Sequence, residues 1–352
     1  RLMPTITIDG KKLDFEPGQL ILDVAHDNGI KIPHYCYHPS LSVVANCRIC
    51  LAEVWAPNPR NDNKLEPIPK LLPTCQTPAS DGNVVYTTSP KATANQKAVM
   101  EMLLNHHPID CPTWDQAGEC DLQDYAYEYG RGKRRCDTEK ITQSKKDIGD
   151  KIMLYGDRCI MCTRCVRFAD EISGTSELFI DGRGAKEYID VFPGIGINNE
   201  LSGNVIDICP VGAMLDKDFM FQQRVWFLKT TPSIDPLTSS GDNIIIEQND
   251  NAIYRVKPRT NLEINQYWIT DEVRYGWKFV HDESRITEIN DDAEIVAADM
   301  LQQAKSVALL VSPMLSCEDA WLLCNLVRGL DSNAIIGIGP VPIVGEDKTF
   351  KS

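Results

Sequence analysis

The spacing of the cysteines constrains this chain more than any other feature of its sequence. Cys159, Cys162 and Cys165 form a C-x2-C-x2-C run, and Cys209 follows after 43 intervening residues, directly before a proline. This is the bacterial spacing for a four-iron cluster, in which one loop supplies three thiolates and a remote Cys-Pro supplies the fourth. Structural zinc on four thiolates is the weaker alternative. Because the chain has no second triple of this kind, we expect one such cluster. We also expect backbone amides near Cys209 to donate hydrogen bonds to its sulfurs.

A second group of four cysteines has the spacing C-x10-C-x2-C-x24-C: Cys36, Cys47, Cys50 and Cys75. A two-iron cluster needs two thiolates on each iron, and a loop that supplies three while a distant strand returns the fourth is typical of ferredoxins. Zinc sites usually pair two C-x2-C units, and this group contains only one. His34 and His38 lie nearby, but the C-x2-H unit of a Rieske centre is missing. We therefore expect a two-iron cluster on the four cysteines and structural roles for both histidines.

The composition supports thiolate sites over a disulfide framework. Thirteen cysteines permit either interpretation. The first residues lack the plan of a secretory signal, and the members of a C-x2-C unit are too close in sequence to bridge one another easily. A net charge of −14 argues against a nucleic-acid binder, and the basic run 131–136 is short and followed by acids. No stretch of 18 apolar residues is present, so the sequence predicts no membrane-spanning segment.

Residues 1–90 have the pattern of a small mixed sheet. Asp9 and Gly10 form the turn of a hairpin, and a short helix ends near Gly29. Strands are expected at 51–56 and 83–88. Between them, the polar, proline-rich segment 57–70 is expected to bulge into solvent.

Helix signals dominate the next part of the chain. Ser89 and Pro90 serve as N-cap and first residue of a helix that stops before Pro108. A second helix spans 121–129, with Gly130 after it. Later segments are expected to form two strands and a βαβ unit whose helix carries Cys317 and Cys324 as buried packing residues: 243–248, 252–258, 307–312, 317–330 and 334–339.

The loop "HHPIDCPTWDQAGEC", residues 106–120, has the character of a histidine and cysteine metal loop with one cysteine missing. Trp114 occupies the position where a third thiolate is expected, and an indole nitrogen is only a donor. The H-x3-C spacing selects His107 rather than His106.

Four segments carry a resemblance to the large iron–sulfur subunit of respiratory complex I, the G-type chain of NADH–quinone oxidoreductase. These segments are "PHYCYHPSLSVVANCRICLAEV", "HHPIDCPTWDQAGECDLQDYAYEYG", "RCIMCTRCVRFADEISG" and "ELSGNVIDICPVGAM". The resemblance implies that His107, Cys111 and Cys120 are three ligands of a second four-iron cluster. It also implies that the Cys36 group and the Cys159 group are the two-iron and all-cysteine four-iron ligands. The extra four-iron site of some bacterial members has no cysteines here.

The fourth ligand of the histidine site has three explanations: the site is empty, it holds three irons, or another thiolate has replaced the missing one. Cys136 is our hypothesis for the replacement, because the resembling family carries an aromatic residue there while this chain carries an aromatic residue at Trp114. Lys133, Arg134 and Arg135 would favour the thiolate. The alternative is that Cys136 is simply a small buried residue. Asp115 as an oxygen ligand is less favoured, since these sites select thiolates.

These observations predict an α+β chain with a ferredoxin-like (β-grasp) domain at 1–90. A histidine and cysteine cluster domain (91–150) and an all-cysteine four-iron domain (151–230) should follow, then a partial molybdopterin-oxidoreductase-like α/β region (231–352) without a recognisable cofactor site. The resemblance implies one 2Fe-2S cluster and two 4Fe-4S clusters that relay electrons, with no substrate site in this chain.

The expected partners are a flavin-containing NADH-oxidising subunit and quinone-side iron–sulfur subunits of one hetero-oligomeric complex. That complex is expected in a peripheral arm on the cytoplasmic side of a bacterial inner membrane. Two alternatives stay open: a diaphorase-type subunit of an NAD-linked hydrogenase or formate dehydrogenase, and a zinc-stabilised interaction scaffold.

Overall fold

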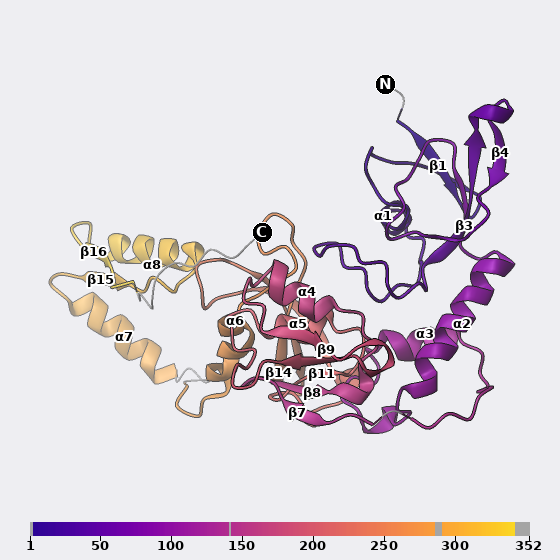
Figure 1. The fold of residues 1–352 in the computed structure, drawn as a ribbon. Coiled ribbons are helices and arrows are strands. Elements are labelled where there is room, and N and C mark those ends of the chain that lie inside the picture. Colours follow the sequence, from indigo (N-terminus) through magenta and orange to yellow (C-terminus); the bar gives the residue numbers. More distant parts are fainter. Residues whose placement is uncertain (1–2, 141, 286–290, 342–352) are drawn as a thin grey trace.

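The computed structural model describes residues 3–140, 142–285 and 291–341. Figure 1 shows an N-terminal sheet, a pair of helices beneath it, a central region of short strands, and a C-terminal unit at the far side. None of the helices in the described ranges is long and apolar enough to cross a bilayer. The structure thus has the mixed α/β character that the sequence predicts.

The N-terminal sheet has the strand order β2-β1-β6-β3-β4, with β5 paired to β3. Asp9 and Gly10 adopt positive φ angles of 47° and 83°, as a tight hairpin turn requires. The pairing of β1 with β6 is parallel, and the short helix α1 packs its buried face on the sheet. The elements are β1 (Thr5–Ile8), β2 (Lys11–Asp14), α1 (Ile21–Asp27), β3 (Leu51–Asn58), β4 (Lys64–Pro67), β5 (Leu72–Pro73) and β6 (Val84–Tyr86).

The insertion 57–70 is largely exposed, as expected, but it is folded into a hairpin. Its first residues extend β3, and residues 64–67 return as β4, antiparallel to β3. Asp62 and Asn63 reverse the chain with positive φ angles of 49° and 57°, a conformation that Asn and Asp tolerate. The polar segment therefore widens the sheet.

Two helices follow and carry the loop of the third candidate site between them. Helix α2 (Pro90–His106) begins as predicted, with the Ser89 hydroxyl accepting from the Ala92 amide at 3.2 Å. It ends with His107 as its C-cap. Helix α3 (Asp121–Tyr129) begins directly after Cys120, and Gly130 follows it.

The central region forms around a buried core that includes Phe168 and Ile172. Its three-stranded sheet has the order β11-β8-β7, and β9 pairs with β10. The elements are β7 (Lys145–Asp147), β8 (Ile152–Tyr155), α4 (Arg164–Glu171), β9 (Leu178–Asp181), β10 (Tyr188–Val191), α5 (Asn204–Ile208) and β11 (Met214–Asp216). Short 3-10 turns occur at Pro59–Asn61, Cys111–Thr113, Gly156–Arg158, Gly184–Lys186, Val225–Phe227 and Gly276–His281.

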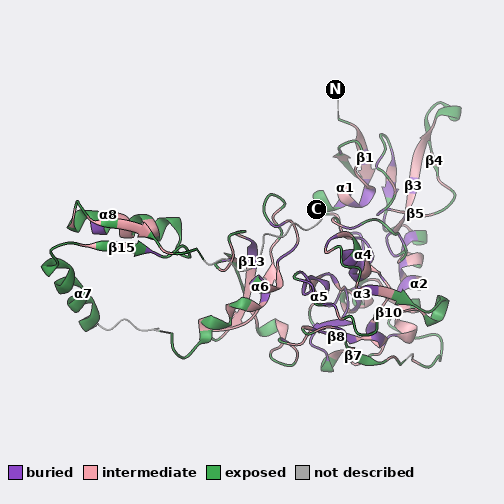
Figure 2. Ribbon diagram, turned by 60° about the vertical axis from the view of Figure 1, so that its left-hand side comes forward, coloured by how far each residue is buried: buried purple, intermediate pink, exposed green. Residues whose placement is uncertain are grey.

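The last part contains a meander and the predicted βαβ unit, in which β15 and β16 are parallel. The elements are β12 (Lys229–Ile234), β13 (Asn243–Asn249), β14 (Ala252–Pro258), α6 (Asp271–Tyr275), α7 (Asp291–Gln303), β15 (Ala308–Val311), α8 (Cys317–Leu330) and β16 (Ile335–Ile338). Figure 2 shows buried residues in both the N-terminal and the central regions, whereas the β15–α8–β16 unit is mostly exposed.

The prediction that Cys317 and Cys324 are buried packing residues is wrong. Cys317 is exposed and Cys324 is half-buried. The physical reason is that α8 packs on a sheet of only two strands, which can cover only a narrow strip of the helix. Trp321 and Leu326 of the same helix are 66% and 56% exposed.

Candidate metal centres

The first centre lies where the loop after α1 meets the strand end at β5. The Sγ atoms of Cys36 and Cys47 are 3.5 Å apart, and those of Cys50 and Cys75 are also 3.5 Å apart. Two thiolates on one tetrahedral metal, with bonds of about 2.3 Å, lie about 3.7 Å from each other. The neighbouring thiols of Cys47 and Cys75 lower the pKa of Cys36. Two pairs side by side fit a cluster with two thiolates on each iron.

The loop around these cysteines is folded by residues in left-handed backbone conformations. Ala45 and Arg48 have φ angles of 48° and 59° and flank Cys47 at a distance of one or two residues. Such conformations turn successive backbone groups inward, which brings Cys36, Cys47 and Cys50 to one buried place. The backbone conformation of the loop therefore places its three cysteine side chains close together.

His34 and His38 have partners other than these thiols. Nδ1 of His34 lies 3.0 Å from the Ile32 carbonyl oxygen, and the ring of His38 stacks on Trp268 at 5.2 Å. Burial lowers the pKa of each histidine to about 4. Both are therefore neutral packing residues at the edge of the loop.

The second centre brings together Cys162 and Cys165, which are buried, and Cys159 and Cys209, which are half-buried. Burial raises the pKa of each thiol, and their neighbouring thiols raise those of Cys159, Cys162 and Cys165 further. The cysteines also lie at the junction of two hydrophobic cores. These thiols would bind as thiolates only beside positive charge, which an iron cluster would supply.

Backbone amides surround the second centre, as the sequence predicts. The amide of Met161 donates to the Cys159 sulfur at 3.4 Å. The amides of Val211, Ala213 and Met214 hydrogen bond to the Cys209 thiol and lower its pKa against the effect of burial. Met161 has a φ angle of 53°, so the loop curls its amides toward the sulfurs. Amide donors of this kind stabilise thiolate ligands and tune the potential of a bound cluster.

The third predicted site, at His107, Cys111 and Cys120, lacks the clustered thiols of the first two centres. His107 is buried and its Nδ1 has no hydrogen-bond partner, but its ring contacts the indole of Trp114 with centroids 5.1 Å apart. Trp114 is 2% exposed, and the guanidinium of Arg158 stacks on it at 4.1 Å. The sulfur of Cys120 lies 3.9 Å from the Pro210 carbonyl oxygen, beside the second centre. The indole thus fills the middle of the motif, and these residues alone do not fit a four-ligand cluster.

The remaining residues proposed for this site lie apart. Cys111 is half-buried at the start of a 3-10 turn, and Cys136 is exposed. The Cys136 thiol donates to Oδ1 of Asn105 at 2.8 Å. Oδ1 of Asp115 accepts from the Phe221 amide, which ties the loop to the segment after β11. Across the described residues, no three His, Cys, Asp or Glu side chains converge at the spacing of one metal ion.

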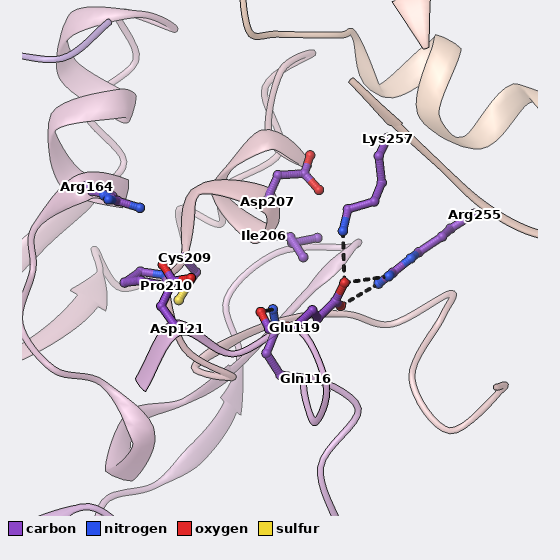
Figure 3. Close-up of a pocket in the computed structure, with 10 residues that line it drawn as sticks. All are labelled: Gln116, Glu119, Asp121, Arg164, Ile206, Asp207, Cys209, Pro210, Arg255 and Lys257. Atoms are coloured by element: carbon purple, nitrogen blue, oxygen red, sulfur yellow. Dashed lines mark hydrogen bonds and ion pairs between the residues drawn. The ribbon is translucent and has the colours of Figure 1, made fainter. Parts of the chain in front are cut away.

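A cavity of about 120 Å³ opens beside the second centre (Figure 3). Cys209 and Arg164 line it on one side. On the other side, Arg255 donates to both carboxylate oxygens of Glu119 at 2.9 and 2.7 Å, and Lys257 donates at 3.0 Å. This ion-pair network attaches the loop before Cys120 to strand β14.

Three buried arginines next to the cysteine triple were not apparent from the sequence pattern. Arg158, Arg164 and Arg167 are 4%, 8% and 8% exposed, although arginine is almost never buried without partners. Two of them recur three residues apart on α4 among apolar residues and a cysteine. A charged pair on the buried face of a helix is the signal that could have revealed them.

Comparison with family models places each cysteine group in a known type of domain. Residues 3–90 match the 2Fe-2S iron-sulfur cluster binding domain, and residues 96–135 match the NADH-ubiquinone oxidoreductase-G iron-sulfur binding region. Residues 149–215 match the ferredoxin-like domain of NADH-quinone oxidoreductase subunit 3. Residues 228–278 match the NDSU1/NuoG-like 4Fe-4S domain, but this segment contains no cysteine, so it adds no thiolate site.

Similar proteins are found in mitochondria and bacteria. The 78 kDa subunit of NADH-ubiquinone oxidoreductase from Neurospora crassa is 43% identical over 273 residues, which is 77% of this chain and 35% of that protein. The G-type chain of NADH-quinone oxidoreductase from Rickettsia felis is 35% identical over 344 residues, or 94% of this chain and 50% of that protein. The chain therefore spans half the length or less of these relatives.

A solved structure shares the fold. A chain of the NAD+-reducing [NiFe]-hydrogenase in its H2-reduced state superposes with a TM-score of 0.54 and 28% sequence identity. The match covers 63% of this chain and 91% of the hydrogenase chain. The likeness covers most of the hydrogenase chain and leaves over a third of this chain outside it.

The folds, the cysteine centres and these matches define an iron–sulfur protein with one 2Fe-2S domain and 4Fe-4S domains of the ferredoxin type. Within this class, the matches agree on one lineage. The chain belongs to the family of the large iron–sulfur subunit of NADH–quinone oxidoreductase, which includes the bacterial G-type chains and the mitochondrial 78 kDa subunit.

Proposed function

We propose that this chain is an electron-relay subunit of an NADH–quinone oxidoreductase. When bound, iron–sulfur clusters accept and donate single electrons, and the protein holds them, shields them from water and sets their potentials. The paired thiols of the first centre and the four cysteine thiols of the second are the residues that would do so here. The observation that carries the proposal is the close approach of Cys36 to Cys47 and of Cys50 to Cys75, each 3.5 Å between sulfurs.

We also propose two kinds of partner, and the relatives' names, which are those of NADH-quinone and NADH-ubiquinone oxidoreductase subunits, support membership of such a complex. An NADH-oxidising flavoprotein would donate electrons to this chain, and quinone-side iron–sulfur subunits would accept them. We place the assembly in a peripheral arm on the cytoplasmic side of a bacterial inner membrane. The Rickettsia felis relative, a named component of NADH-quinone oxidoreductase, supports membership of such a complex.

We propose four functional units along the chain, at 1–90, 91–150, 151–230 and 231–352. The family matches at 3–90, 96–135 and 149–215 support the first three. The parallel β15–α8–β16 unit supports a partial molybdopterin-oxidoreductase-like region in the last. The stretches 286–290 and 342–352 of that region lie outside the described residues.

For the third site, we propose that Cys136 provides the thiolate that Trp114 cannot. Asn105, which contacts the Cys136 thiol, lies two residues before His107 at the end of α2. Lys140 donates to the Leu104 carbonyl oxygen at 2.6 Å, so the segment after Cys136 follows the same helix end. To bind a cluster, the Cys136 side chain would turn from Asn105 toward His107.

The proposed relay is tested on the chain isolated under anaerobic conditions. Iron and acid-labile sulfide should be present, the brown absorption should bleach on reduction, and EPR should detect both two-iron and four-iron signals. A Cys165→Ser variant should lose one four-iron signal and keep the two-iron signal. Cys324→Ser is the matched control, because this half-buried thiol lies on α8, outside the three candidate sites. Colourless protein with little iron would refute the relay and favour a zinc scaffold.

The Cys136 assignment has its own test. A Cys136→Ala variant should lose one four-iron signal or convert it to a three-iron signal, whereas Cys317→Ala, at another exposed thiol, should not. An unchanged spectrum would refute Cys136 as a ligand without affecting the other two centres.

The hydrogenase likeness favours a second candidate, a diaphorase-type subunit that relays electrons between NAD and hydrogenase. It rests on the match to 91% of the hydrogenase chain. Purification of the native assembly separates the two candidates, because copurifying membrane subunits and quinone reduction support the first, and nickel with hydrogen uptake supports the second.

A further inference from the structure

Two buried arginines of α4 reach out of their own region into the loop of the first centre. Arg164 donates to the Tyr37 carbonyl oxygen at 2.5 Å and to that of Ile208 at 3.2 Å. Arg167 donates to the Ser42 carbonyl oxygen at 2.5 Å. Both therefore cross the boundary between the residue 36–50 loop and the four-iron region.

Arg167 goes further, because a single guanidinium nitrogen contacts both centres. Its Nη2 donates to the carbonyl oxygen of Cys36 at 2.6 Å and to that of Cys162 at 3.3 Å. Cys36 belongs to the first centre and Cys162 to the second. The guanidinium therefore lies between two candidate clusters, one hydrogen bond from the backbone of a ligand residue in each.

The hydrogen bonds of Arg167 do not pair its charge with a carboxylate. Its hydrogen bonds end on neutral oxygens: those of Ser42, Cys36, Cys162 and the Thr163 hydroxyl. Cys162, Cys36 and Glu171 raise the pKa of Arg167 and Arg164 lowers it, so all four interact electrostatically with the guanidinium. Glu171 itself accepts from the amide and hydroxyl of Ser42. A positive charge held out of water acts strongly on negative charge nearby.

A second hydrogen bond joins the loop of Cys47 to the loop of Cys162. The side-chain amide of Asn46 donates to the Met161 carbonyl oxygen at 3.1 Å. Asn46 directly precedes Cys47, and Met161 directly precedes Cys162. The two cysteine loops thus face each other, and Arg167 is the side chain that hydrogen bonds to both a Cys36 and a Cys162 carbonyl oxygen.

We propose that Arg167 is a positioning residue shared by the two-iron and four-iron centres, which fixes their separation and raises the reduction potential of both. The proposal rests on the proposed function, because it needs both cysteine groups to hold clusters. Reduction adds one negative charge to a cluster, and a fixed positive charge beside it favours the reduced state. Because one side chain acts on both clusters, it shifts both reduction potentials in the same direction.

The test is an EPR-monitored redox titration of both signals in the anaerobically isolated full chain. In Arg167→Met, the reduction equilibrium constants of both clusters should fall about tenfold, which is 59 mV for a one-electron couple. Arg167→Lys keeps the charge, so both reduction equilibrium constants should stay within about threefold of those of the unaltered chain. If Arg167 had only a structural role, Arg167→Met and Arg167→Lys would lose similar amounts of bound cluster. The reduction potentials of the clusters that remain would then be unchanged.

Arg259→Met is the matched control, since this arginine donates to Asn243 and Ser233 and lies outside the cysteine loops. It should move neither potential. If Arg167→Met does not fold, Arg167→Gln removes the charge and keeps an amide donor for the carbonyl oxygens.

The outcomes separate the inference from the proposed function. Lowered potentials of both clusters in the neutral variants support it. A shift of one cluster alone, loss of one cluster alone, or no shift in a neutral variant overturns it while the relay stands. Absence of both signals from the unaltered chain overturns the relay, and the role of Arg167 fails with it.

Discussion

Glu119 offers the sharpest test of how the third loop is held. Its carboxylate accepts two hydrogen bonds from Arg255 and one from Lys257. The side chains of Glu119 and Arg255 are 21% and 11% exposed, so most of this pair is out of water. Breaking a buried pair costs about 3–5 kcal/mol when the remaining charge has no partner. Here Arg255 keeps Glu247 and Lys257 is 26% exposed, so we expect Glu119→Ala to cost about 2–3 kcal/mol.

The measurement is amide hydrogen exchange in residues 111–120 and in β14, which reports the local opening free energy. A loss of about 2–3 kcal/mol reduces protection roughly 30- to 150-fold. Glu119→Gln keeps one acceptor and should lose about half of that free energy. Glu128→Gln is the control, because its pair with Lys31 is exposed and should contribute under about 1 kcal/mol. Unchanged protection in Glu119→Ala, or no coupling between Glu119→Ala and Arg255→Met, would refute the reasoning.

Three further predictions concern stability. Ser89→Ala removes the cap of α2 and should cost about 1 kcal/mol in urea unfolding, whereas Ser89→Thr should cost much less; equal losses would contradict the cap. Gly118→Ala should lower the melting temperature, because its φ is 92° and the added Cβ would lie 2.8 Å from Cγ2 of Val225; Gly132→Ala, with φ 68° and open space, should lower it less. Removing iron with a chelator should lower the melting temperature of the whole chain, and an unchanged melting curve would argue against clusters that stabilise the fold.

The local signals of the sequence predicted local structure well. Asp9 and Gly10 turn the first hairpin, Ser89 caps α2, and Gly130 follows α3. Each of these depends on a few neighbouring residues, so the pattern contains the cause. The cysteine spacing likewise indicated which thiols the fold brings together in the Cys36 and Cys159 groups, and their role as cluster ligands stays a prediction.

Contacts between distant segments could not be predicted from spacing. Arg167 meets Cys36 across 131 residues, and Arg255 meets Glu119 across 136. Nothing in the order of residues pairs them, because each contact requires two finished regions to dock. The exposure of Cys317 is a similar case, since burial on a helix depends on what the rest of the fold brings to it.

The third site shows where a motif stops being informative. A histidine and cysteine loop specifies a cluster only while every ligand is present, because the ligands share one centre. Once Trp114 replaces one of them, its indole contacts His107 and Arg158, and Cys120 lies beside Pro210. Any fourth thiolate must then come from outside the loop, and its approach depends on tertiary structure. The Cys136 thiol contacts Asn105 at the end of α2, and we propose it as that fourth thiolate. The Cys136→Ala variant tests this proposal.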